Sequence, residues 1–171
     1  PERILLETLV RLAAVPLLAA PFRGAAQDTV LWSDGRTWSG TVRLGGDGRL
    51  PLHDGTRLRP VPLETVARID WRVATQRMER AWAFREAGQT AKRYEGDPYP
   101  VRHWKAQVTL RNGETIPGHL PATVFFLEDA EDVSRLVVKS KQRGRPGETP
   151  DDLVAPVALQ FAPRAGDANL P

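Results

Sequence analysis

The stretch Val30–Val42 reads VLWSDGRTWSGTV, and in the second half of the chain Val108–Leu120 reads VTLRNGETIPGHL. Each copy places an Asp-Gly or Asn-Gly pair between two alternating segments, and a second glycine follows at the same distance, Gly40 in one copy and Gly118 in the other. Asp-Gly and Asn-Gly favour tight hairpin turns, because both residues tolerate positive φ. The sequence therefore predicts a duplicated β-hairpin, and hence two small barrels or one duplicated sheet.

The duplication also indicates what the tryptophans of the first copy do. Trp32 and Trp38 lie on the same face of the predicted hairpin, and their equivalents in the second copy are Leu110 and Ile116. A position that accepts either an indole or an aliphatic side chain needs apolar volume rather than a particular ring. We therefore expect Trp32 and Trp38 to belong to the core.

The block Val-x-Leu-x-Asn-Gly-x-x-x-x-Gly-x-Leu in Val108–Leu120, together with its counterpart in Val30–Val42, resembles the opening motif of the Sm-like small five-stranded barrels. The resemblance implies a mainly β protein with two such modules. RNA-binding Sm-like proteins also carry an Arg-Gly turn near the closing strand, whereas the corresponding stretches here read ARID at 67–70 and VAPV at 154–157. The resemblance thus implies the fold and not RNA binding, and nucleic acid is an unlikely partner.

The expected organisation has two β-barrel modules joined by one helix and a Pro-rich loop. Module 1 is predicted over residues 28–71 and module 2 over 104–161, with a helical and Pro-rich linker at 72–103 and a flexible tail at 162–171.

The linker helix is predicted over Thr75–Ala87. Thr75 can cap its first turn, Met78 and Trp82 recur one turn apart, and Gly88 can end it in the left-handed conformation. We expect the Met78 and Trp82 stripe to pack the helix against a barrel.

Residues 1–26 are interpreted as a signal peptide. Leu12–Phe22 is an uncharged apolar run of 11 residues, and Gly24, Ala25 and Ala26 form a small-residue cleavage pattern. A helix needs roughly 20 apolar residues to cross a bilayer, so no permanent membrane span is expected. The protein is therefore predicted to be exported, to the periplasm or out of the cell.

Composition excludes several kinds of chemistry. The chain has no cysteine, which excludes disulfides, thiolate metal sites and a cysteine nucleophile. Its formal net charge is +3, and removal of segment 1–26 takes away three Arg and two Glu, which leaves +2. This near balance gives by itself no argument for nucleic acid or anionic lipid as partner.

No catalytic or metal-binding motif is present in the sequence. The serines lack a Gly-x-Ser-x-Gly elbow, and the acidic run Glu128–Asp132 lacks the spacing of a calcium loop. His53, His103 and His119 do not have the spacing of a zinc motif. We therefore predict no enzyme activity, no metal and no cofactor.

The segment between the modules is the candidate binding surface, because aromatic and basic residues cluster there beside prolines that stiffen the backbone. The predicted binding residues are Arg93, Tyr94, Tyr99, Arg102, His103 and Trp104. Trp71 and Trp104, which border this segment, are expected to be freer to face a ligand than the tryptophans of the repeat. A second basic stretch, formed by Lys139, Lys141, Arg143 and Arg145, can present a cationic stripe.

These features together predict a non-enzymatic interaction or scaffold module whose partner is a protein or a cell-envelope polymer. Two alternatives remain open. One is a hydrolase of cell-wall or polysaccharide material that uses paired carboxylates, whose separation a sequence does not give. The other is a carbohydrate-binding module with coplanar exposed Trp or Tyr rings.

Overall fold

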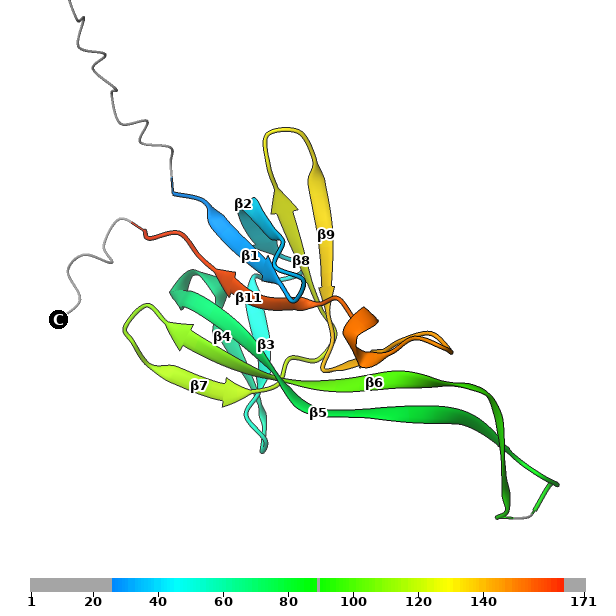
Figure 1. The fold of residues 1–171 in the computed structure, drawn as a ribbon. Coiled ribbons are helices and arrows are strands. Elements are labelled where there is room, and N and C mark those ends of the chain that lie inside the picture. Colours follow the sequence, from blue (N-terminus) through cyan, green and yellow to red (C-terminus); the bar gives the residue numbers. More distant parts are fainter. Residues whose placement is uncertain (1–25, 89, 165–171) are drawn as a thin grey trace, which may run out of the picture.

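The computed structural model describes residues 26–88 and 90–164, and it confirms a mainly β protein (Figure 1). The strands are β1 (Asp28–Trp32), β2 (Thr37–Leu44), β3 (Arg49–His53), β4 (Leu58–Pro62), β5 (Val66–Phe84), β6 (Lys92–Leu110), β7 (Thr115–Gly118), β8 (Thr123–Glu128), β9 (Val133–Val138), β10 (Lys141–Arg143) and β11 (Pro156–Gln160). Two short 3₁₀ turns, η1 (Leu63–Thr65) and η2 (Pro150–Asp152), precede β5 and β11. Among the described residues, no helix is long and apolar enough to cross a membrane. The predicted signal peptide and most of the predicted tail lie outside the described residues.

The two copies of the motif form matching hairpins, β1–β2 and β6–β7. Val30 pairs with Trp38 in the first hairpin, and Val108 pairs with Ile116 at the same motif positions in the second. The turn glycines Gly35 and Gly113 both have φ of 85°. The positive φ explains why glycine occupies this position in both copies.

The second glycine of each motif lies where a further strand crosses. A Cβ atom at Gly40 would collide with the carbonyl oxygen of Glu128, and one at Gly118 would come within 2.6 Å of the carbonyl oxygen of His53. In both places only a residue without a side chain lets the two backbones approach.

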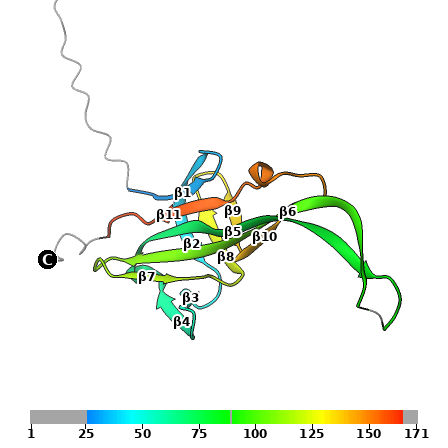
Figure 2. The same cartoon turned by 60° about the horizontal axis from the view of Figure 1, so that its bottom comes forward.

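Strand pairing beyond the hairpins crosses between the halves of the chain (Figures 1 and 2). One path runs β11-β1-β2-β8-β9, so the first hairpin takes all its further neighbours from the second half. The other path runs β5-β6-β7 and continues through a bridge between His119 and His53 to β3-β4. The two halves are therefore interleaved, each supplying the central hairpin of one path and the flanking strands of the other.

The two paths meet where β5 pairs with β11. Ile69 faces Leu159 at the centre of this pairing, with Arg68 opposite Gln160 and Asp70 opposite Ala158 on either side. The two paths correspond strand by strand, β11-β1-β2-β8-β9 to β5-β6-β7-β3-β4, so they meet at equivalent strands. The side chains of Ile69 and Leu159 are fully buried, which places the core at this junction.

The expected arrangement of barrels and helix is not what the structure has. Within the described residues the strands follow the open path β10-β6-β5-β11-β1-β2-β8-β9, with β3–β4 as a two-stranded sheet, and no closed barrel forms. In the predicted linker, residues 72–84 and 92–103 belong to β5 and β6, which are 19 residues each, rather than to a helix and a loop.

The helix prediction over Thr75–Ala87 is wrong for a specific reason. A spacing of four residues between Met78 and Trp82 fits one turn of a helix and also one face of a strand. In the structure Trp82 and Phe84 lie on the same face of β5, opposite Tyr94 and Lys92 of β6. Such cross-strand pairs supply side-chain contacts between the two strands themselves. A single helix would have to make its contacts with the rest of the protein.

Candidate functional site

The outer parts of β5 and β6 project from the body as a long hairpin arm, residues 72–103 (Figure 1). A register shift in the β5–β6 pairing separates the pair Glu79–Tyr99 from the pair Ala81–Glu95. Between these pairs β6 has more residues than β5, and one of them is Gly96, with φ of 68°. The ribbon therefore changes direction here. We call residues 80–95, beyond the shift, the distal arm.

The distal arm exposes three large aromatic side chains on one face. Trp82, Phe84 and Tyr94 are 46%, 54% and 60% exposed, and we call them the aromatic patch. Trp82 pairs with Tyr94 across the strands, and its ring centroid lies 5.0 Å from that of Phe84. The Nζ atom of Lys92 lies 4.2 Å from the Trp82 ring centroid, a cation–π contact.

At the base of the arm, Arg102 is buried and fully engaged. Its guanidinium group donates to Gln76 Oε1 at 2.8 Å, to the Leu153 carbonyl at 3.1 Å and to the Pro150 carbonyl at 2.8 Å. It also lies over the ring of Trp104, 5.2 Å from the centroid. Arg102 therefore ties the arm to the loop that contains η2.

Tyr99 is also buried, and the guanidinium carbon of Arg143 lies 3.8 Å from its ring centroid. Arg143 belongs to β10, which pairs with β6 so that Lys141 faces His103. Part of the predicted cationic stripe is thus a strand that packs along the base of the arm.

The structure divides the predicted binding residues between two environments. Arg93 and Tyr94 are exposed on the distal arm, where Arg93 pairs with Glu95. Tyr99, Arg102 and Trp104 are buried at the base, and His103 is half-buried beside them. Their joint role in binding stays a prediction. Trp82 and Phe84 were not predicted to bind, although their alternation and the facing Tyr94 were the available signal.

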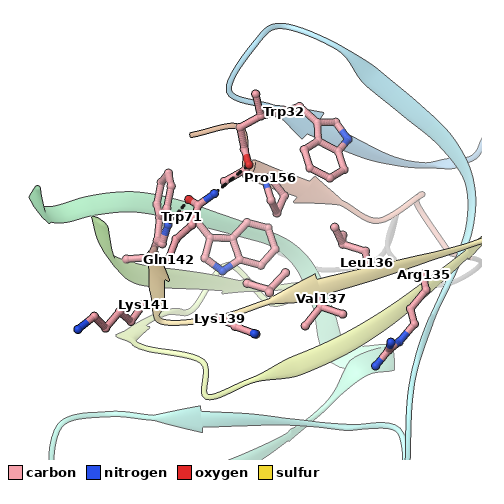
Figure 3. Close-up of a pocket in the computed structure, with 13 residues that line it drawn as sticks. Trp32, Trp71, Arg135, Leu136, Val137, Lys139, Lys141, Gln142 and Pro156 are labelled. Carbon is pink, nitrogen blue, oxygen red and sulfur yellow. Dashed lines mark hydrogen bonds between the residues drawn. The ribbon is translucent and has the colours of Figure 1, made fainter. Parts of the chain in front are cut away.

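A pocket of about 190 Å³ opens beside the base of the arm (Figure 3). Three tryptophans from separate strands line it, Trp32 from β1, Trp71 from β5 and Trp104 from β6. The remaining lining residues come from β9, the turn after it, β10, the segment before β11 and the first residue of β11, and they are Arg135, Leu136, Val137, Val138, Lys139, Lys141, Gln142, Val154, Ala155 and Pro156. We call this cavity the tryptophan pocket.

The three indole N–H groups of the tryptophan pocket differ in their hydrogen bonding. Trp104 Nε1 donates to Gln142 Oε1 at 3.3 Å, and Gln142 Nε2 in turn donates to the Val154 carbonyl at 3.0 Å. The Nε1 atoms of Trp32 and Trp71 are buried and have no hydrogen-bond partner among the described residues.

The histidines are partly brought together. His53 and His119 stack with ring centroids 4.7 Å apart at the bridge between β3 and the end of β7, while His103 lies on β6. Across residues 26–88 and 90–164, no group of three or more His, Cys, Asp or Glu side chains is placed to hold a metal ion.

The acidic run at Glu128–Asp132 forms the turn between β8 and β9. Asp129 accepts hydrogen bonds from the backbone N–H groups of Glu131 and Asp132, and these lower its pKa below the usual value. This carboxylate therefore stabilises a turn.

Comparisons of the chain with protein-family models, with curated proteins and with solved structures found no match. Two places in the described structure offer chemistry to a partner, the aromatic patch at the tip of the arm and the tryptophan pocket at its base.

Proposed function

We propose that the protein is an exported, non-enzymatic interaction module that binds a partner protein through its distal arm. The observation that carries this proposal is the exposure of Trp82, Phe84 and Tyr94 on one face of a projecting ribbon. Clusters of exposed large apolar side chains mark interaction sites, and a two-stranded ribbon alone is only marginally stable in water. A partner that covers the aromatic patch would bury these apolar side chains and would add stabilising contacts to the ribbon.

The residue types of the distal arm fit an acidic protein surface. Aromatic residues and arginine are enriched at the centres of protein interfaces. Within residues 80–95, four cationic side chains outnumber two acidic ones, Arg80, Arg85, Lys92 and Arg93 against Glu86 and Glu95. The complementary surface therefore has an apolar hollow with acidic residues around it.

Ring geometry favours a protein over a polysaccharide as partner. A sugar platform needs aromatic faces that are open and lie in one plane. The ring planes of Trp82 and Phe84 are inclined at 71°, and Lys92 covers one face of Trp82. The aromatic patch therefore suits an irregular protein surface better than a flat pyranose.

The body of the molecule suits a scaffold that holds the arm. Matching hairpins support the interpretation that the chain arose from two Sm-like modules, here with exchanged strands rather than side by side. Arg102 braces the base of the arm from inside, because its three nitrogens bind residues of both β5 and the η2 loop.

Site-specific photo-crosslinking tests the proposal. A photoreactive phenylalanine analogue replaces Phe84 or Tyr94 in the full chain, and in control proteins it replaces Leu58 or Val133, which are 56% and 54% exposed elsewhere. We expect one protein adduct from the arm positions that the controls do not give.

The purified adduct partner must then bind the wild type directly. We expect the Trp82→Ser/Tyr94→Ser variant to bind at least tenfold more weakly, and the Leu58→Ser/Val133→Ser variant to bind as the wild type does. Adducts that form equally from all four positions, or only with a second copy of the chain, would contradict the proposal.

Export is tested by the mature N-terminus. Cleavage after Ala26 predicts a secreted or periplasmic protein that begins at Gln27, which N-terminal sequencing and intact mass will show. A protein that stays in the cytoplasm with residues 1–26 attached would contradict this part.

A further inference from the structure

One wall of the tryptophan pocket is the free edge of β9. The consecutive residues Arg135–Lys139 line the pocket, and none of the described residues of β8 does. Neighbouring side chains of a strand point to opposite faces, so a cavity that touches every residue in a row lies beside the backbone. β9 ends the path of strands, and within the described residues it pairs only with β8. Figure 3 shows Arg135–Lys139 along one side of the hollow and Trp32 and Pro156 on the other.

The pairing of β8 with β9 directs backbone groups of Arg135 and Val137 toward this free edge. The Gly45 N–H donates to the Val124 carbonyl at 3.0 Å, so the backbone of Val124 bonds toward β2. Val124 faces Val137 in the register, and an antiparallel ladder alternates hydrogen-bonded with non-hydrogen-bonded pairs. Val137, and Arg135 two residues before it, therefore point their N–H and C=O groups away from β8. In the part of the chain that the structure describes, these groups have no backbone partner.

The equivalent strand β4 carries prolines at the matching positions. The turn before β4 and the turn before β9 are closed by the same kind of backbone hydrogen bond, at 3.1 Å in each. Counted from these turns, Pro60 of β4 matches Arg135 of β9, and Pro62 matches Val137 in the same way. Proline has no N–H group, and it commonly protects a strand edge against further pairing. β9 lacks this protection, so its edge is able to accept another strand.

The groove beside β9 combines positive charge with apolar volume. Arg135 and Lys139 are exposed and form no ion pair among the described residues, and none of the described lining residues is acidic. Leu136 and Val138, on the opposite face of the strand, are buried. An apolar cavity of about 150 Å³ holds a molecule of benzene. The tryptophan pocket, at about 190 Å³, therefore has room for one phenyl side chain.

We propose that the free edge of β9 binds an extended, acidic segment of a partner protein as an additional strand. The backbone of the segment pairs with Arg135 and Val137, and one large apolar side chain enters the tryptophan pocket. The acidic side chains next to it in sequence point to the other face, where Arg135 and Lys139 lie. In this mode of recognition the main-chain hydrogen bonds supply affinity, and the pocket and the cross-strand charge pairs supply specificity.

This site is separate from the aromatic patch. The patch lies beyond the register shift of the arm, whereas the groove lies at the base of the arm. Val133, a control position of the crosslinking experiment, comes before the groove and is not among its lining residues. Binding at β9 and binding at the distal arm can therefore be measured independently.

Amide NMR of the full chain tests for the added strand directly. The probe is the peptide acetyl-EVEFEVE-amide, in which glutamates alternate with apolar residues around one phenylalanine. We expect the amide protons of Arg135 and Val137 to move downfield on titration and to exchange more slowly with solvent, because they gain acceptors. The amides of Ser134 and Leu136 point toward β8 and serve as internal controls whose resonances change less.

Two altered peptides test the pocket and the charges separately. Alanine in place of the phenylalanine removes the side chain that fills the pocket, and lysine in place of the glutamates reverses the charge. We expect each change to weaken binding by about tenfold.

Protein variants test the two sides of the site. Val137→Pro gives β9 the proline that β4 has at Pro62, and we expect the same thermal unfolding as the wild type but about tenfold weaker peptide binding. Arg135→Glu/Lys139→Glu changes only exposed side chains, and it is expected to bind acetyl-KVKFKVK-amide more tightly than the acidic peptide. Trp82→Ser, on the distal arm, is the control that leaves peptide binding unchanged.

Three results would overturn the proposal. The first is no change at the Arg135 and Val137 amides with millimolar acidic peptide, and the second is equal affinity for the acidic and the basic peptide. The third is a shift of the same amides with protein concentration when no peptide is present, which would assign the edge to a second copy of the chain. None of these results bears on partner binding by the aromatic patch, which the crosslinking experiment tests.

Discussion

Ile69 and Leu159 face each other at the centre of the pairing between β5 and β11, and both side chains are fully buried. The two residues come from opposite halves of the chain, and the strands on each side of them belong to paths that draw on both halves. The molecule is therefore organised around a contact between its halves rather than around two separate cores.

Cleavage of the arm tip tests this interleaving. A specific protease site is placed between Arg85 and Ala91, which close the hairpin through the hydrogen bond from the Arg85 N–H to the Ala91 carbonyl. After cleavage we expect the two pieces to co-elute on native gel filtration and to unfold in one transition, because each path of strands needs both. Pieces that separate and stay folded would instead show that residues 28–71 and 104–161 are self-contained modules.

The paired glycines Gly40 and Gly118 give a prediction with a matched control. Alanine at either position is expected to lower the free energy of unfolding by about 1–3 kcal/mol, because the new methyl group meets a carbonyl oxygen of the crossing strand. Gly45→Ala is the control, since its nearest neighbours lie at 3.4 Å, an ordinary contact. Urea denaturation measures all three, and a Gly45→Ala loss as large as the others would contradict the explanation.

Removal of the buried guanidinium at Arg102 should loosen the base of the arm. Arg102→Ala leaves the Pro150 and Leu153 carbonyls without their donor, and we expect a loss of about 2–4 kcal/mol. Arg102→Lys is expected to recover only part of this, because an ammonium group does not reproduce the planar fork. Thermal unfolding measures stability, and limited proteolysis shows whether cleavage appears near η2. Equal stability of the wild type and Arg102→Ala would contradict the bracing role.

The turn that presents those carbonyls carries a pH dependence. Asp152 accepts from the Thr149 backbone N–H at 2.7 Å and from the Thr149 hydroxyl at 2.8 Å, and these bonds lower the pKa of Asp152 below its usual 3.8. Because the pKa is lower in the folded state, this contribution is present above the unfolded pKa and is lost as the pH falls through the folded value. We expect Asp152→Asn to be less stable than the wild type at neutral pH, with the difference shrinking below about pH 4. Urea midpoints at several pH values measure this, and a difference independent of pH would contradict it.

Local sequence was sufficient for the hairpins, because their turns depend on two adjacent residues and one φ angle. Local sequence was insufficient to predict that the two halves are interleaved. Gly40 and Gly118 indicate that another backbone passes close by, but the same pattern results whichever half supplies that backbone. The arm was missed because Met78 and Trp82 fit two periodicities, and the choice between them depends on Tyr94 in another strand.

The sequence predicts the lining of the tryptophan pocket only in part. Trp71 and Trp104 were expected to be freer to face a ligand than Trp32 and Trp38, and this is wrong, because both are buried in the core at 5% and 7% exposure whereas Trp32 and Trp38 are half-buried. Trp71 and Trp104 still form part of the pocket wall. Trp32, expected in the core by its equivalence with Leu110, is half-buried and packs against the core as Leu110 does, and it also lines the pocket. The repeat explains the volume of that side chain but not its place in the pocket wall, whose other lining residues include several from 135–156.

Interleaved strands also govern when the chain can fold. Val30 in β1 pairs with Leu159 in β11, so one edge of β1 stays open until residues 156–160 have been made. Contacts between such distant residues form slowly, and unpaired strand edges invite aggregation while they wait. A newly made chain therefore exposes the outer edge of β1 until β11 is available, and this long-range pairing slows folding.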